Sequence, residues 1–73
     1  MRAQVITCVR LNNTVWGNPR YEYTFQFEDG LTLSGKSKSD AMWCYNPPRT
    51  GDWVLVQYHY TKAGNVIIDD MEE

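Results

Sequence analysis

Apolar and polar residues alternate with a period of two along most of the chain, which is the spacing of strands that bury one face. The clearest run is 20–28, where an aromatic residue occupies every odd position from 21 to 27 and polar residues lie between them. Comparable alternation covers 3–11, 31–38 and 53–60, and it resumes at 66–71. The pattern therefore predicts five strands, and it places the rings of 20–28 in the core.

A turn at 28–30 separates two of these runs and can be tested for register. A three-residue loop pairs Phe27 with Leu31 and keeps the apolar residues of both strands on one face. A two-residue loop would instead pair Phe27 with Thr32, which mixes the two faces. We therefore predict a three-residue loop in which Gly30 adopts the left-handed conformation that glycine tolerates.

The last two runs follow the same rule. A three-residue loop at 62–64 pairs Tyr60 with Val66 and again ends in a glycine. Continued without a break, this register places Leu55 opposite Met71, with both side chains on the outer face of the sheet. The sequence thus predicts a second hairpin of the same design.

Two segments interrupt the alternation. Residues 12–19 are rich in turn-forming residues and join the first two strands. A short helix is expected between the third and fourth strands, with Ser39 as its N-cap and Asp40 in its first turn. This helix must end near Tyr45, because the Asn-Pro-Pro run at 46–48 cannot continue it.

The order of three strands, a short helix and two strands predicts an all-β fold, a small five-stranded OB-like barrel. An SH3-like barrel, whose helical turn comes later in the chain, is the alternative. The 73 residues are enough for one small domain and not for two, so we expect residues 1–73 to form a single barrel.

Charge is distributed unevenly along the chain. The formal net charge is −2, from seven Lys and Arg and nine Asp and Glu residues. Four of the acids fall within 69–73, and the rest of the chain holds seven basic and five acidic groups, a net charge of +2. The sequence therefore predicts an acidic tail at 69–73 on a weakly basic body. Such a body lacks the strong basic stripe of a dedicated double-strand DNA binder.

Few residues are suited to catalysis or metal binding. The only Cys and His residues are Cys8, Cys44 and His59, whereas a structural zinc site uses four such ligands. No phosphate-binding loop, nucleophile elbow or spaced carboxylate pair occurs. We therefore expect no enzyme activity, no metal, no cofactor and no small-molecule substrate. Without a secretion signal or an apolar run of roughly 18 residues, we expect a cytoplasmic protein with free thiols and no membrane contact.

The outer face of the last predicted hairpin is more apolar than a solvated face should be, and Ile6 and Cys8 of the first strand would extend it. We interpret this row as a docking surface. The chain is then a non-enzymatic binding module that docks on a protein partner or forms a homo-oligomer. The alternative is that the termini or the helix cover the row. The residues predicted for docking are Trp53, Leu55, His59 and Ile67, with Trp16 and Arg49 as loop contacts.

A second hypothesis is a weak single-stranded nucleic-acid-binding protein. The outer face of 20–28 and 31–38 carries no aromatic residue, so it offers no stacking platform for bases. At one end of this face we predict a small basic and aromatic patch, where cations would bind phosphates. The residues of this patch are Trp16, Arg20, Lys36, Lys38 and Arg49.

Short motifs in the first two thirds of the chain match the pattern GNPRY…F-x-DG…DA…Y. They are Trp16–Tyr21, Phe27–Gly30, Ser39–Ala41 and Tyr45. In these motifs the chain resembles small uncharacterised proteins of phages and prophages, over residues 16–45. The resemblance implies a small accessory protein of a mobile genetic element that binds a host or phage factor.

Overall fold

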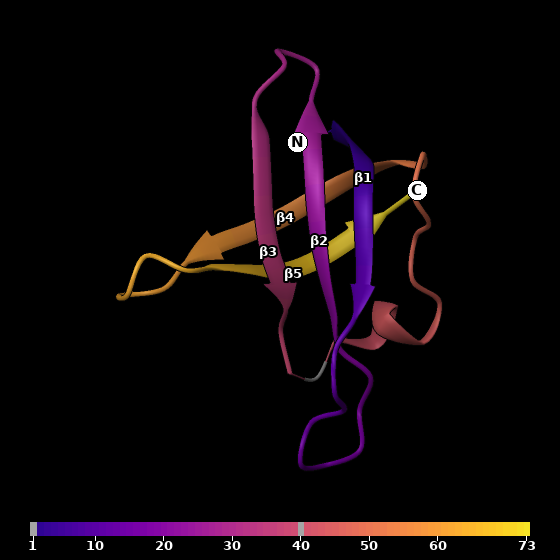
Figure 1. The fold of residues 1–73 in the computed structure, drawn as a ribbon, viewed down its shortest axis with the longest axis vertical. Helices are drawn as coiled ribbons and strands as arrows, with labels where there is room; N and C mark the ends of the chain where they lie inside the picture. Colours follow the sequence, from indigo (N-terminus) through magenta and orange to yellow (C-terminus); the bar gives the residue numbers. More distant parts are fainter. Residues whose placement is uncertain (1, 40) are drawn as a thin grey trace.

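The computed structural model describes residues 2–39 and 41–73, which form a closed five-stranded barrel with one short helical turn (Figure 1). The strands are β1 (Arg2–Arg10), β2 (Tyr21–Phe27), β3 (Thr32–Ser37), β4 (Trp53–Tyr60) and β5 (Val66–Glu72). Around the barrel they follow the order β1-β2-β3-β5-β4, and β4 pairs with β1 to close it. The pairing of β3 with β5 is parallel, and the other pairings are antiparallel.

The helical turn is η1 (Met42–Tyr45), a 3-10 helix between β3 and β4. The all-β prediction is therefore confirmed, and the helical turn lies where an OB-like barrel was predicted to have it. The predicted start of the helix is wrong. Ala41 occupies the N-cap position without a side-chain cap, so Ser39 does not cap the turn, and Asp40 lies outside the described residues.

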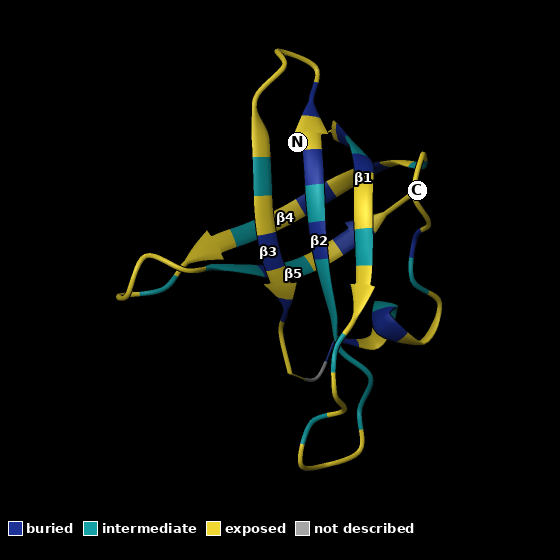
Figure 2. Ribbon diagram, in the orientation of Figure 1, coloured by how far each residue is buried: buried dark blue, intermediate teal, exposed yellow. Residues whose placement is uncertain are grey.

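The aromatic face of β2 fills the barrel, as its alternation predicts. Tyr23 and Phe25 are fully buried, Phe27 is nearly so, and Tyr21 packs against this core. The rings of Tyr23 and Phe25 stack with their centroids 5.6 Å apart. Figure 2 shows buried positions alternating with intermediate or exposed ones along β2, and with exposed ones in the first half of β4.

Both predicted hairpin registers are confirmed next to their turns. Across the first hairpin, Phe25 pairs with Leu33, and Gly30 in the turn has a φ of 89°. Across the second, Tyr60 pairs with Val66. A left-handed φ at the last loop residue is strained for any side chain with a Cβ, so the glycine at this position fixes the loop length.

A bulge in β5 overturns the predicted register farther from the second turn. Tyr58 pairs with Ile68 but Gln57 pairs with Asp70, so β5 holds one extra residue at this point. Past the bulge the faces exchange. Met71 is buried instead of lying outside, and it is Glu72, not Met71, that pairs with Leu55.

The bulge also corrects the predicted acidic tail. Residues 69–72 belong to β5 instead of extending into solvent, and Asp70, Met71 and Glu72 pair with β4 while Asp69 is the extra residue of the bulge. The physical reason is the thioether side chain of Met71. Joining the core buries it, and this anchors the acidic residues beside it to the sheet.

A second bulge, in β1, corrects the predicted faces of that strand. Val5 pairs with Phe25 and Thr7 with Thr24, which leaves one extra residue between them. The exchange turns Cys8 toward the core, where it packs beside buried side chains. Cys8 therefore does not extend the outer apolar row.

Candidate binding surfaces

The predicted docking row on β4 is open to solvent at its first half. The exposed fractions are 42% for Trp53 and 52% for Leu55. Both chain ends nevertheless reach this pair, since Arg2 lies over the Trp53 ring and Glu73 lines a hollow beside it, so the alternative of a covered row applies in part. The pair lies on the outer face because alternation along β4 directs Val54 and Val56 into the core.

The second half of the row is different in character. His59 is exposed, and its Nδ1 lies 2.8 Å from Oδ2 of Asp69 in an ion-pair geometry. Ile67, which pairs with His59, is only half-exposed and also pairs with Lys36 of β3. Five residues of β4 lie between Trp53 and His59, which places them about 20 Å apart along the strand. His59 and Ile67 therefore lie apart from the exposed Trp53 and Leu55.

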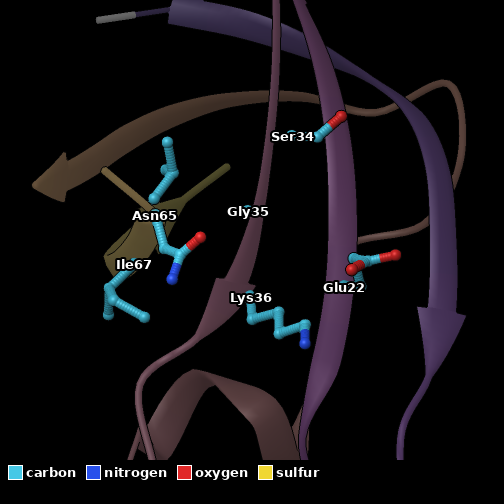
Figure 3. Close-up of a pocket in the computed structure, with 7 residues that line it drawn as sticks. Glu22, Ser34, Gly35, Lys36, Asn65 and Ile67 are labelled. Carbon is cyan, nitrogen blue, oxygen red and sulfur yellow. The ribbon is translucent and has the colours of Figure 1, made fainter. Parts of the chain in front are cut away.

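Ile67 forms part of a different feature, a cavity of about 240 Å³ between β3 and the beginning of β5. Figure 3 shows Asn65 and Ile67 on one side of β3 and the Lys36 side chain extending toward β2. Glu22 of β2 lines the same cavity and pairs with Lys36 across the strands. This face of the barrel is polar, as predicted.

Barrel closure brings both ends of the chain to the exposed pair on β4. Arg2 pairs with Leu55 where β1 meets β4, and its guanidinium carbon lies 5.5 Å from the centre of the Trp53 ring. A hollow of about 240 Å³ opens here, and its lining includes Glu73 as well as Arg2. We call Arg2, Trp53, Leu55 and Glu73 the seam surface. The sequence pattern points to its two apolar members but not to its two charged ones.

The two predicted loop contacts lie in different parts of the molecule. Trp16 is in the β1–β2 loop (residues 11–20), and 85% of it is exposed. Arg49 is in the connection from η1 to β4, where its backbone N–H donates to Oδ2 of Asp52 at 2.9 Å. Figure 1 shows the β1–β2 loop at the lower end of the barrel and this connection along its right side. The structure does not bring Trp16 and Arg49 together.

The cations of the predicted nucleic-acid patch differ in their exposure and in their hydrogen bonds. Lys36 and Lys38 are exposed. Arg20 is half-buried and donates from Nη2 to the backbone oxygen of Ser37 at 3.2 Å, so it supports the base of the loop. An additional arginine, Arg10, lies at the same end and is exposed. Arg10 reaches this end because it pairs with Tyr21 across β1 and β2, a long-range pairing that the prediction of the patch did not include.

The Cys44 thiol and the Tyr23 phenol are buried inside the molecule. Cys44 is buried in η1, and this burial raises the pKa of its thiol. Burial likewise raises the pKa of the Tyr23 phenol, whose hydroxyl donates to the backbone oxygen of Pro48 at 2.8 Å. Both groups are therefore protonated at neutral pH. Cys8 is half-exposed and is not disulfide-bonded.

Comparison with known proteins adds no relative: no family model, no curated protein and no solved structure matches the chain. Within residues 2–39 and 41–73, no helix is long and apolar enough to span a membrane. In the same part of the chain, no three His, Cys, Asp or Glu side chains gather as a metal-binding group.

Proposed function

We propose that this protein is a non-enzymatic binding module that docks on a protein through the seam surface. The observation that carries the proposal is the exposure of Trp53 and Leu55 side by side on a strand whose alternate residues Val54 and Val56 are buried in the core. Trp and Arg dominate the binding energy of protein interfaces, and here Arg2 lies over the Trp53 ring. The adjacent hollow can receive an apolar side chain of the partner.

A second copy of the chain is the partner that fits this surface. The hollow carries one positive group, Arg2, and one negative group, Glu73. In a two-fold symmetric contact each surface meets its own copy, so Arg2 of one copy faces Glu73 of the other in both directions. The opposite charges pair while Trp53 and Leu55 are withdrawn from water.

The resemblance of residues 16–45 to phage proteins supports a setting for this docking. In that setting the chain is a small cytoplasmic accessory protein of a mobile genetic element. A host or phage factor would then be the competing partner for the same surface.

The test is the oligomeric state of purified protein, measured by light scattering over a range of concentrations. We expect the wild type to form a dimer and Leu55→Asp to be a monomer, because a buried carboxylate in the contact would be unpaired. Leu31→Asp is the matched control, since Leu31 is 67% exposed in the turn between β2 and β3 and lies outside the seam surface. It should dimerise like the wild type.

Circular dichroism should show that both variants remain folded, because both replaced side chains face solvent. A wild type that stays monomeric at every concentration would overturn self-docking. Equal loss of the dimer in Leu55→Asp and Leu31→Asp would show that the contact lies elsewhere.

A further inference from the structure

The β1–β2 loop is held rigidly although it projects from the barrel. Its tip is closed by Thr14, whose backbone N–H donates to the Asn18 oxygen at 3.0 Å and whose hydroxyl accepts from the backbone N–H of Asn18 at 3.1 Å. The Asn18 side chain is fixed in turn, because its Oδ1 accepts from the Tyr45 hydroxyl of η1 at 2.8 Å. The loop is thus ordered before any ligand arrives.

This ordered tip presents apolar side chains to solvent. Val15 is 94% exposed and Trp16 is 85% exposed, so neither contributes to the core. Tyr45, which braces the loop through its hydroxyl, is itself 63% exposed. A preorganised loop that offers an indole ring to solvent loses little entropy when a ligand binds to it.

The charge around the loop is positive. Residues 10–21 hold two arginines and no acid. Arg10 lies 5.5 Å from the centre of the Tyr21 ring. It donates from Nη1 to the Tyr21 hydroxyl at 3.3 Å and from Nη2 to Oδ1 of Asn13 at 2.7 Å, and its other guanidinium N–H groups remain available. Lys38 is exposed, and it follows Ser37, which binds the Arg20 guanidinium at the base of the loop.

We propose that this end of the barrel binds single-stranded nucleic acid weakly. One base stacks on Trp16, and the phosphates that follow lie against Arg10 and Lys38. An extended chain rises about 3.3 Å per residue, so Trp16 at the tip is no more than about 13 Å from Arg20 and about 16 Å from Leu11 at the base of the loop. A flexible strand of a few nucleotides spans either distance. The inference concerns a different surface from the seam and does not rest on the proposed function.

A nucleic-acid strand fits these groups better than an acidic peptide does. The site combines a free aromatic ring with separate cations, which are the two elements that bind single strands without sequence preference. A peptide carboxylate would use the cations but not the exposed face of the indole ring. Exposed Asn12, beside Asn13, adds an amide that can hydrogen-bond to a base edge.

The test is a titration of a fluorescent oligothymidylate with the full chain, followed by anisotropy at low and at physiological salt. We expect Trp16→Ala to weaken binding about 5- to 140-fold, the range for loss of one stacked base. Tyr60→Ala is the matched control. Tyr60 is 62% exposed at the end of β4, beside the β4–β5 loop, so this variant should leave binding unchanged.

The salt dependence tests the phosphate contacts. With two phosphates neutralised, at about 0.7 each, log K should fall by about 1.4 for a tenfold rise in salt, or about 25-fold. Lys38→Gln should reduce this slope by about 0.7, whereas Lys62→Gln, an exposed lysine in the β4–β5 loop, should not change it.

Three results would overturn the proposal: no binding at low salt, equal weakening by Trp16→Ala and Tyr60→Ala, or an unchanged salt slope in Lys38→Gln. Inorganic polyphosphate separates charge from stacking. If it displaces the oligonucleotide as well as free oligothymidylate does at equal phosphate concentration, bases do not contribute and the stacked-base site is wrong.

Discussion

The buried side chain of Tyr23 contacts three separate segments of this barrel. Its ring stacks on Phe25 within β2 and meets the edge of the Trp43 ring of η1, with centroids 5.8 Å apart. Its hydroxyl donates to the backbone oxygen of Pro48 in the connection to β4. One buried side chain thus joins a strand, the helical turn and the segment that leads to β4.

This burial predicts that the protein is destabilised at alkaline pH. Burial raises the pKa of Tyr23 in the folded state, so the folded protein holds the phenol proton more tightly than the unfolded chain does. Tyr23 should therefore not change the free energy of unfolding below pH 10, the ordinary pKa of tyrosine. Above pH 10 it should lower that free energy. The raised pKa of Cys44 acts in the same direction from about pH 9.

Urea unfolding from pH 7 to pH 11 measures this effect. Tyr23→Phe should flatten the alkaline fall, although it should lower stability at pH 7 by about 1–3 kcal/mol, because the Pro48 oxygen loses its donor. Tyr60→Phe, at an exposed ring, should change neither quantity. An alkaline fall of equal steepness in wild type and Tyr23→Phe would show that this phenol is not its source.

At the scale of elements, the two bulges decide which residues reach the core and which reach the surface. Each inserts one residue and exchanges the faces of the strand beyond it. In β5 the exchange buries Met71 and places Glu72 opposite Leu55. The exposed apolar surface is therefore shorter than uninterrupted alternation predicts.

The β5 bulge predicts that Met71 and Leu55 contribute unequally to stability, although the uninterrupted register would place both on the same face. Met71→Ala should lower the free energy of unfolding by about 2–5 kcal/mol, because Met71 is buried in the core. Leu55→Ala should cost less than about 1 kcal/mol, because half of Leu55 is already in water. Denaturant unfolding compares them, and similar costs would contradict the bulge.

The close approach of β3 and β5 leaves no room for a side chain at Gly35. A Cβ added at Gly35 would lie 2.7 Å from Cγ1 of Val66 and 3.0 Å from its backbone oxygen. Gly35→Ala should therefore destabilise the barrel by about 1–3 kcal/mol. Adding Val66→Ala removes the nearer atom and should recover part of this loss in a double-mutant cycle. If the stability losses of Gly35→Ala and Val66→Ala simply add in the double variant, the two strands do not approach this closely at Gly35.

The success and failure of sequence reasoning follow from what alternation can encode. Alternation identifies the strands and the inward face of β2, and the glycines at 30 and 64 set both turns. A bulge leaves no such signal, because the inserted residue can be of almost any type. The displaced residues, Cys8 and Met71, are apolar enough to suit either face.

At the scale of the whole molecule, the barrel separates two surfaces that share Trp16 and Arg49 in the prediction from sequence. Closure of β1 on β4 brings Arg2 and Glu73, from opposite ends of the chain, to one hollow, and no local pattern predicts this meeting. The same closure separates Trp16 from Arg49, which the sequence suggested as joint loop contacts. The fold was predictable from local periodicity, whereas the surfaces depend on distant segments.

The three tryptophans allow one measurement to test this separation, the ¹H–¹⁵N spectrum of the indole groups. Raising the protein concentration should shift the Trp53 signal, and adding oligothymidylate at low salt should shift that of Trp16. Trp43, whose Nε1 donates to the backbone oxygen of Asp69 at 3.3 Å, should stay fixed as an internal control. Concentration shifts at Trp16 instead of Trp53, or equal shifts of all three signals in both titrations, would contradict two separate binding surfaces on one barrel.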